Sequence, residues 1–172
     1  MRDSTVVIHP AARTSRDLSE AARSMLGRRL YAVLATQNDD GTPHLAPVMF
    51  LFDGERIVVE TGATTRKARN VASRGHASVL VQTPEASWVL GSGPATIVSG
   101  ADAVGHRERL RSKYLTAAGR RACGNLLDEM DDVAILVVPT HWLSWDLANF
   151  VKALAARGLD PANAHTWFLA DE

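Results

Sequence analysis

The chain has 172 residues, a formal net charge of zero at pH 7 and an apolar content of 46%. This length and composition predict one globular domain, residues 1–172, with a substantial hydrophobic core. Zero net charge argues against a nucleic-acid partner, and no apolar run is long enough to indicate a membrane partner. The single cysteine, Cys123, excludes an intrachain disulfide. Together with the absence of a signal-like apolar stretch near Met1, this favours a cytoplasmic location.

The N-terminal part of the sequence predicts an arm followed by a helix. Residues 1–14 show no clear period and are expected to form the arm. A helix is expected over residues 15–29, because Asp17 and Glu20 have capping-box spacing and Gly27 stands where a helix would end. The predicted core face of this helix consists of Leu18, Ala21, Ala22, Met25 and Leu26.

The middle of the chain predicts strands joined by hairpins. Asp-Gly pairs at 40–41 and 53–54 are typical of tight turns between strands. Six strands are expected, at residues 30–36, 44–52, 56–61, 76–83, 87–100 and 131–139. This pattern favours a mainly β (α+β) fold, a six-stranded antiparallel split β-barrel with flanking helices, over a parallel sheet. We interpret "GSGPA" at 91–95 as a bulge or bend inside a strand, because it lacks the setting of a phosphate-binding loop.

The C-terminal part predicts helices around the last strand. Residues 101–130 are expected to be mainly helical, with Arg107 and Arg111 on a charged surface. Asp131 and Asp132 resemble loop residues that precede a strand. An apolar stripe of Leu147, Phe150, Val151 and Leu154 predicts a C-terminal helix that Gly158 ends. The barrel core is therefore expected at about 18–147, followed by a helix and tail at 147–172.

The segment "TGATTRKARNVAS", residues 61–73, contradicts the usual charge preference of a helix. Arg66, Lys67 and Arg69 fall in the first turn of a predicted helix, where the helix dipole disfavours cations. Residues that break such a local rule tend to mark functional sites. The pattern therefore indicates that this corner binds a negatively charged group.

The same segment offers hydrogen-bond donors for an anion. Thr61, Thr64 and Thr65 supply hydroxyl groups, and Gly62 allows close approach of the backbone. A helix that begins near Thr65 would present free N–H groups, and Asn70 would share a face with the cations. We interpret the segment as a compact dianion site. The alternative, a solvated basic helix that follows a strand, stays open.

No conventional catalytic or metal-binding constellation is present in the sequence. The six histidines are scattered, and a lone His44 near the second strand is more typical of a structural residue. Cys123 is interpreted as a small buried hydrophobe, and at least one of Trp142 and Trp145 as packing. We therefore predict no catalytic side chain and no metal ligand.

The order of these elements, with "VVETGATTRKARNVA" and the "SWD" at 144–146, resembles the pyridoxamine 5'-phosphate oxidase-like FMN-binding split β-barrel superfamily. Within it, the chain is most similar to the flavin/deazaflavin (F420-dependent) oxidoreductases. The resemblance covers about residues 18–147 and implies a homodimer with two cofactor sites at the subunit interface. The chain lacks the arginine-and-histidine motif with which true pyridoxamine phosphate oxidases end.

The resemblance also implies a cofactor, FMN or coenzyme F420, and the residues that hold it. The cofactor phosphate would contact Thr65, Arg66, Lys67 and Asn70. The ring would lie over Pro47, Val48 and Met49 and beside Glu60 and Thr61, and Trp145 or Trp142 would approach from the partner chain.

The implied activity is hydride transfer between the cofactor and a small unsaturated or quinone-like substrate. Because such a cofactor carries the chemistry, a missing catalytic triad is expected. Two alternatives remain open at this point. One is a non-catalytic protein that binds a flavin, a deazaflavin or haem, and the other is a fold relative that has lost the cofactor.

Overall fold

The computed structural model describes residues 11–129 and 131–160, apart from the side chains of residues 124–129. The strands are β1 (Ala11–Ala12), β2 (Tyr31–Gln37), β3 (Pro43–Met49), β4 (Leu51–Phe52), β5 (Ile57–Gly62), β6 (His76–Gln82), β7 (Trp88–Val98), β8 (Asp132–Val137) and β9 (His141–Trp145). The helices are η1 (Ser15–Asp17), α1 (Glu20–Gly27), α2 (Arg66–Arg74), α3 (Gly100–Tyr114), α4 (Ala117–Glu129) and α5 (Leu147–Ala155).

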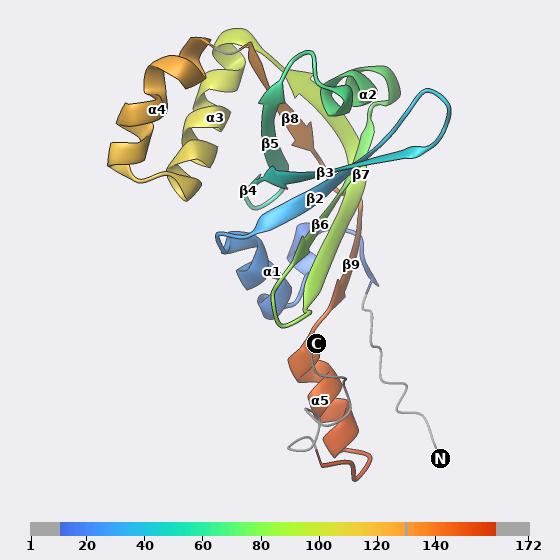
Figure 1. Ribbon diagram of the computed structural model, residues 1–172. Helices are drawn as coiled ribbons and strands as arrows, with labels where there is room; N and C mark the ends of the chain where they lie inside the picture. The colour runs from blue at the N-terminus through green and yellow to red at the C-terminus, as the bar shows by residue number, and fades with distance from the viewer. Residues whose placement is uncertain (1–10, 130, 161–172) are drawn as a thin grey trace, which may run out of the picture.

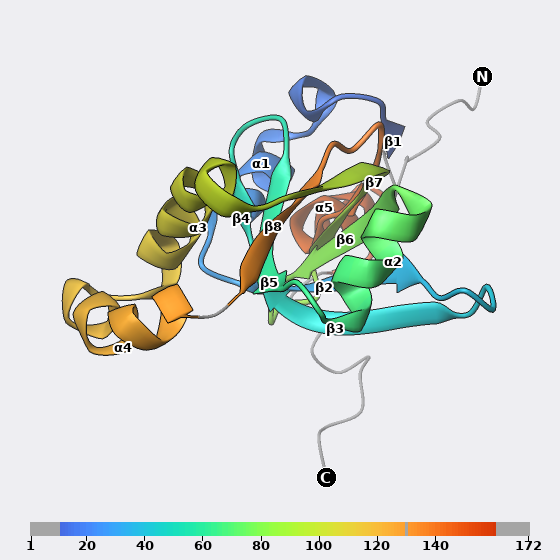
Figure 2. The same cartoon turned by 90° about the horizontal axis from the view of Figure 1, so that it is seen from above.

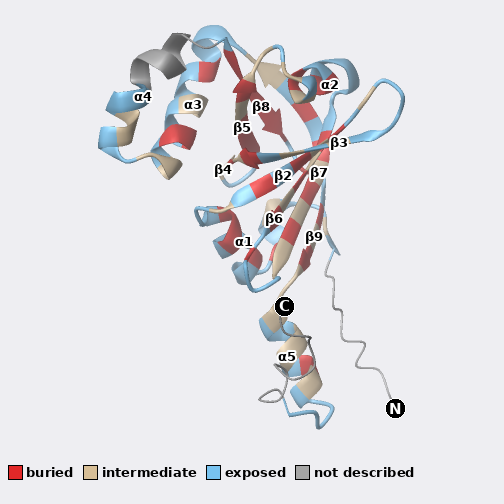
Figure 3. Cartoon of the chain, in the orientation of Figure 1, coloured by how far each residue is buried: buried red, intermediate tan, exposed pale blue. Residues whose placement is uncertain are grey.

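The strands form one curled, wholly antiparallel sheet, so the predicted split β-barrel is confirmed (Figure 1). The order is β3-β2-β6-β7-β8-β5-β4, and β9 pairs with both β7 and β1. Because β3 stands at one end of this order and β5-β4 at the other, the barrel opens between them. Helix α2 packs mainly on β2 and β7, and seen from above it lies beside β6 and β7 (Figure 2). The buried residues cluster inside the curl of the strands (Figure 3).

Strand β7 joins the two halves of the barrel. It pairs with β6 up to the pair His76↔Pro94 and with β8 from Ala95 onward. A Cβ on Gly93 would lie 2.2 Å from the carbonyl oxygen of Val138, so only glycine fits there. The predicted placement of "GSGPA" inside a strand is confirmed, and the segment lies where β7 passes from one half to the other.

The two predicted hairpin turns are confirmed, but the number of strands is larger than expected. Gly41 and Gly54 have φ of +84° and +104° in the turns that follow β2 and β4. The strand expected over 44–52 is divided by the buried Phe50 into β3 and β4, which belong to different halves of the sheet. Residues 141–145, for which no strand was expected, form β9. Their burial alternates with a period of two, which both tryptophans obscured in the sequence.

The first helix begins later than the sequence predicts. Ser19 caps α1, because its Oγ accepts a hydrogen bond of 3.1 Å from the Ala22 N–H. Asp17 instead closes the 3-10 turn η1, where its carboxylate accepts from the backbone and hydroxyl of Thr14. The expected end at Gly27 is confirmed. Of the predicted core face, Ala21 alone is exposed.

The remaining helices lie outside the barrel. Helix α3 packs on the outer surface of β5 and β8 through Ala103 and Leu110. Helix α5 extends from the end of β9, away from α2 (Figure 1), and ends three residues before Gly158. None of the helices in the described ranges is long and apolar enough to span a membrane. Of the predicted arm and tail, residues 1–10 and 161–172 lie outside the described residues.

Candidate functional site

The N-terminus of α2 is open, as the sequence predicted. Thr65 is the N-cap residue, but its hydroxyl does not accept from the helix. It donates 2.8 Å to the Gly62 carbonyl and lies 3.1 Å from the Thr61 hydroxyl. The first helical bond runs from the Arg69 N–H to the Thr65 carbonyl at 3.1 Å. The N–H groups of the first three helical residues therefore have no acceptor within residues 11–129 and 131–160, and they are available to an anion.

The cations at this end of α2 form no ion pair with a carboxylate of the residues that the structure describes. Lys67 is half-buried, and it forms no ion pair or hydrogen bond with any residue that the structure describes. Arg66 and Arg69 are exposed. Arg66 lies near the β2–β3 turn, because it lines a hollow together with Asp39. Hydrogen bonds from Thr42 lower the pKa of Asp40 in the same turn, and the charge of Arg66 acts in the same direction. A half-buried cation without a counter-ion, beside free N–H groups, is suited to binding a phosphate.

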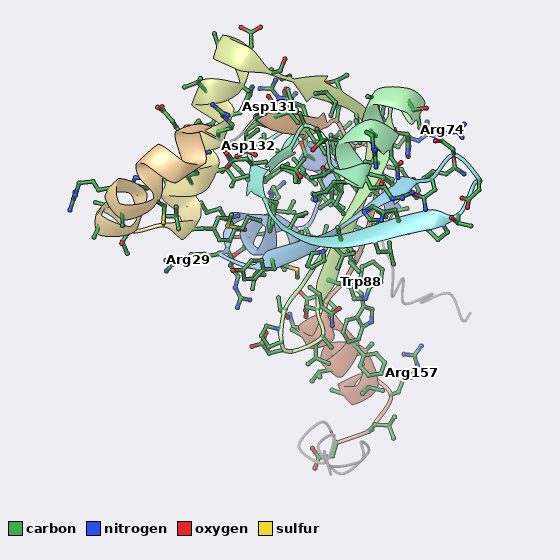
Figure 4. All side chains as sticks on the ribbon, turned by 45° about the horizontal axis from the view of Figure 1, so that its top comes forward. Arg29, Arg74, Trp88, Asp131, Asp132 and Arg157 are labelled. Atoms are coloured by element: carbon green, nitrogen blue, oxygen red, sulfur yellow. The ribbon has the colours of Figure 1, made fainter. Side chains whose placement is uncertain are left out.

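A hollow of about 370 Å³ continues along α2 from this corner. It is lined by Asp39, Arg66, Arg69, Asn70 and Ser73. At its far end Arg74 is engaged, because its Nη2 donates 3.0 Å to the Asp39 carbonyl and lies 3.7 Å from the Asp39 carboxylate (Figure 4). Two of the three arginines on this flank of α2 therefore keep their charge available.

Asn70 fixes α2 against the sheet. It is buried, and its Nδ2 donates to the Thr36 hydroxyl at 3.1 Å and to the Asn38 side chain at 3.0 Å. Both amide hydrogens are used in this way. The contact of Asn70 with a phosphate stays a prediction. Its observed bonds hold the N-terminus of α2 beside β2, and we call this N-terminus, with Thr61, Thr65 and Lys67, the anion corner.

The three residues predicted beneath a ring lie on β3, an edge strand of the sheet. Val48 points into the core, whereas Pro47 is exposed and Met49 is half-buried on the outer side. This alternation follows from the period of a strand. Of the three, Pro47 and Met49 present side chains to the outside, and Val48 can contribute only its backbone.

Glu60 and Thr61 point to opposite sides of β5. Thr61 lies beside Thr65, whereas Glu60 faces α3 and accepts hydrogen bonds from both Arg111 Nε (3.2 Å) and Arg111 Nη2. Burial raises the pKa of Glu60, and the Arg111 guanidinium opposes this shift. The structure therefore joins Thr61 to the anion corner and Glu60 to a separate buried ion pair.

The residues that hold this ion pair were not predicted from the sequence. Arg111, expected on a charged surface, is buried, and Asp132, expected in a loop, is a buried residue of β8. Arg111 Nη2 lies 3.5 Å from the Asp132 carboxylate. The signal was present in the helical spacing of Ala103, Leu110 and Arg111, since apolar neighbours on one face indicate that the arginine among them is buried.

The end of α3 clamps the residue that follows β3. The Lys113 Nζ lies 3.8 Å above the Phe50 ring and donates 3.3 Å to the carbonyl of Leu26, near the C-terminus of α1. Burial lowers the pKa of Lys113 to about 8. The Tyr114 hydroxyl accepts from the Phe50 N–H at 3.2 Å. Helix α3 thereby fixes the end of the strand that carries Pro47 and Met49.

The two tryptophans of β9 have different environments. Trp142 is fully buried and packs edge-on against Phe52, so the expectation that it could approach a partner's site is wrong for this residue. Trp145 is half-buried, lies opposite Trp88 across β7–β9, and has its ring 5.9 Å from that of Phe150. The end of β9 lies far from α2 (Figure 1). Within one chain Trp145 therefore does not reach the anion corner.

Several known proteins are similar to this chain in sequence or in structure. A relative from Mycobacterium tuberculosis (strain CDC 1551 / Oshkosh), an F420H(2)-dependent biliverdin reductase, is 36% identical over 106 residues, which are 60% of this chain and 77% of the relative. The solved structure of an F420 reductase is similar with a TM-score of 0.58 and 27% identity, covering 73% of this chain and 98% of that one. The conserved hypothetical protein Rv2991 from Mycobacterium tuberculosis gives a TM-score of 0.62 and 26% identity, over 81% and 90% of the two chains.

The family model of pyridoxamine 5'-phosphate oxidase matches residues 18–145, which include strands β2 to β9 and the open N-terminus of α2. The matched range ends at Trp145, so α5 lies beyond it. The chain belongs to the pyridoxamine 5'-phosphate oxidase family.

Proposed function

We propose that the protein is an oxidoreductase that binds a flavin-type cofactor, coenzyme F420 in preference to FMN, and transfers hydride between it and a small electron-poor substrate. The observation that carries this proposal is the open N-terminus of α2 with the half-buried Lys67, which forms no ion pair within residues 11–129 and 131–160. Free N–H groups, a lysine and nearby arginines form a donor set that fits a phosphate. When bound, the cofactor would supply the hydride chemistry, and the chain would hold it, orient it and exclude water.

The surplus of positive charge on α2 supports F420. FMN carries one terminal phosphate, whereas F420 has an internal phosphodiester and an acidic tail that continues outward. Arg66 and Arg69 line the hollow that leads away from the first phosphate position. The activity named for the mycobacterial relative also supports this choice. Affinity for F420 should fall steeply as salt rises, because exposed charges contribute much of it.

The proposed substrate is an unsaturated ketone, a quinone or a tetrapyrrole. Pro47, Val33, Tyr31 and Leu45 form an exposed apolar area on the outer side of β2 and β3, next to the half-buried Met49. An apolar area of this kind suits a flat, electron-poor acceptor. The named substrate of the mycobacterial relative supports the tetrapyrrole class.

The proposed active form is a homodimer. On the outer face of the sheet, the cross-strand pairs Pro47↔Val33, Val33↔Leu80, Leu80↔Leu90 and Leu90↔Leu143 form one apolar row over five strands. A second copy would cover this row, and stable interfaces of obligate dimers bury roughly 2,000 Å² or more. The same contact would allow the partner subunit's Trp145 to approach the cofactor. Light scattering should give twice the chain mass of 18.6 kDa, and a single-chain mass at micromolar concentration would contradict the dimer.

The exposed thiol supports the proposed cytoplasmic location. Cys123 is free and exposed, which corrects its expected burial. An exposed free thiol is compatible with a reducing compartment.

Two titrations followed by a turnover assay test the proposed function. FMN and F420 are titrated into the protein side by side and followed by fluorescence. Reduced F420 is then mixed with the protein and an enone, a quinone or biliverdin, and its oxidation is recorded. The proposal predicts tighter binding of F420 and acceptor-dependent oxidation. Tighter binding of FMN would overturn the cofactor choice, and binding without turnover on any acceptor would favour a carrier.

A further inference from the structure

A buried ionic cluster lies directly behind the anion corner. We define the cluster as Glu60, Arg111 and Asp132, whose side chains are between 5% and 10% exposed. Arg111 contacts Glu60 through both Nε and Nη2, and its Nη2 also lies 3.5 Å from an oxygen of Asp132. A guanidinium has a planar fork of donors, which allows one side chain to hold two carboxylates in fixed directions.

The cluster connects the two strands from which the anion corner begins. Glu60 lies on β5 two residues before Gly62, and Asp132 is the cross-strand partner of Gly62 on β8. One residue further, the Ala63 N–H donates 2.8 Å to the Asp131 carbonyl. Arg107, one turn before Arg111 on α3, donates a hydrogen bond of 3.1 Å to the Asp132 carbonyl and adds a second link. Helix α3 thus fixes the last residues of β5 and the first residue of β8, which lie side by side.

The turn that follows is the base of the anion corner. The Thr65 N–H and the Thr65 hydroxyl both bond to the Gly62 carbonyl, at 3.1 and 2.8 Å. Helix α2 starts at the next residue with its free N–H groups, followed by Lys67. A shift of Gly62 would therefore move the donor groups of Thr65, Lys67 and the first helical turn together.

Arg111 lies on the opposite side of β5 from Thr61, where it is buried between α3 and the sheet. It therefore makes no direct contact with an anion at α2. We propose that Arg111 is a positioning residue for the anion corner, acting through Glu60, Asp132 and the turn at Gly62. This inference rests on the proposed function for the identity of the anion, and it assigns helix α3 a role in cofactor affinity. A purely structural Arg111 would lower stability but leave the affinity of the folded protein unchanged.

The test uses Arg111→Lys, which keeps the charge and loses the fork, and Glu60→Gln, which keeps the size and loses the charge. Arg109→Lys, on the exposed side of α3, is the matched control. Binding of F420 is measured by calorimetry at a temperature where every variant is folded. We expect Arg111→Lys and Glu60→Gln to weaken binding by about 2- to 30-fold, the range in which residues remote from a ligand alter affinity. The control should bind as the wild type does.

A double-mutant cycle separates positioning from general destabilisation. If Arg111 positions Lys67, the loss caused by Lys67→Ala will be smaller in the Arg111→Lys background than in the wild type. The inference would be overturned if Lys67→Ala raised the Kd by the same factor in both backgrounds. Wild-type affinity in both cluster variants would overturn it as well.

Hydrogen exchange without any ligand provides a second readout. In Arg111→Lys the amide hydrogens of residues 63–67 should exchange faster than in the wild type, whereas those of α5 should keep their rates. Unchanged exchange at residues 63–67 would also overturn the inference. If the wild type binds neither F420 nor FMN, the proposed function fails, and the exchange result alone decides whether Arg111 holds the turn.

Discussion

Helices α2 and α3 both carry several cations and pack on the barrel, α2 mainly on β2 and β7 and α3 on β5 and β8, but they use these charges in opposite ways. On α3, Arg111 is buried against two carboxylates, and Arg107 bonds to a backbone carbonyl. On α2, Lys67 and Arg69 have no partner among the residues described by the structure, and they lie near the positive end of the helix. Arg107 and Arg111 of α3 therefore stabilise the fold, whereas Lys67 and Arg69 of α2 keep their charge available.

The difference shows that the partner of a cation says more about its role than its type or the number of cations. A cation paired within the protein belongs to the framework, and a cation without such a partner marks a candidate site. A protein gains nothing in stability from positive charges near a helix N-terminus, where they are disfavoured. Removing a framework cation should cost stability, and removing a site cation should cost affinity alone.

Arg111→Met should destabilise the protein by about 3–5 kcal/mol, because it leaves two buried carboxylates without their cation. Urea unfolding followed by circular dichroism measures the change. The exposed Arg109→Met is the control and should lie within about 0.5 kcal/mol of the wild type. Similar midpoints for the two variants would show that the ionic cluster does not stabilise the fold.

Asn70→Ala should lower the free energy of unfolding by roughly 1–3 kcal/mol, because buried Thr36 and neighbouring Asn38 lose a hydrogen-bond donor. The exposed Ser73→Ala on the same helix should have little effect. This result would place Asn70 with the framework although it lies on α2. If Asn70→Ala left stability unchanged, its bonds to β2 would not anchor the helix.

Lys113→Met should change how stability depends on pH. Burial lowers the pKa of Lys113 to about 8 from an ordinary value of 10.5, so between these pH values the unfolded chain binds more protons than the folded one. Stability should therefore rise with pH in this window through Lys113, and the variant should lack this contribution. The difference in unfolding free energy between wild type and variant, measured from pH 7 to 10, is the readout. The exposed Lys152→Met is the control, and a difference that stays constant with pH would contradict the prediction.

Lys67→Ala should leave the stability of the cofactor-free protein unchanged or raise it by a few tenths of a kcal/mol, since a cation leaves the positive end of α2. Thermal unfolding without cofactor measures this small effect. A clear loss of stability would indicate that Lys67 has a structural partner after all.

The sequence predicted the barrel and the open end of α2 because both depend on local signals. Hairpin glycines, strand alternation and the misplaced charges at Arg66 and Lys67 can be recognised without tertiary contacts. The strand boundary at Phe50 and the strand β9 were missed, because apolar residues on both faces conceal the period of a strand.

The buried ion pair behind the site could not be predicted from local sequence signals. Whether Arg111 faces solvent or Glu60 depends on how α3 packs on β5, a contact between residues 51 positions apart. The separation of Glu60 from Thr61 follows from strand alternation, which was visible in the sequence but was not applied to these two neighbours.

The most direct test of the central claim is calorimetric titration of F420 into the wild type and Lys67→Ala, with Lys152→Ala as control. If α2 presents a phosphate site, Lys67→Ala should lose about 1.5–3 kcal/mol of binding free energy, the contribution of a charge-assisted hydrogen bond. This corresponds to a roughly 10- to 150-fold higher Kd, with the control unchanged. Equal Kd values for the wild type and Lys67→Ala would contradict the account.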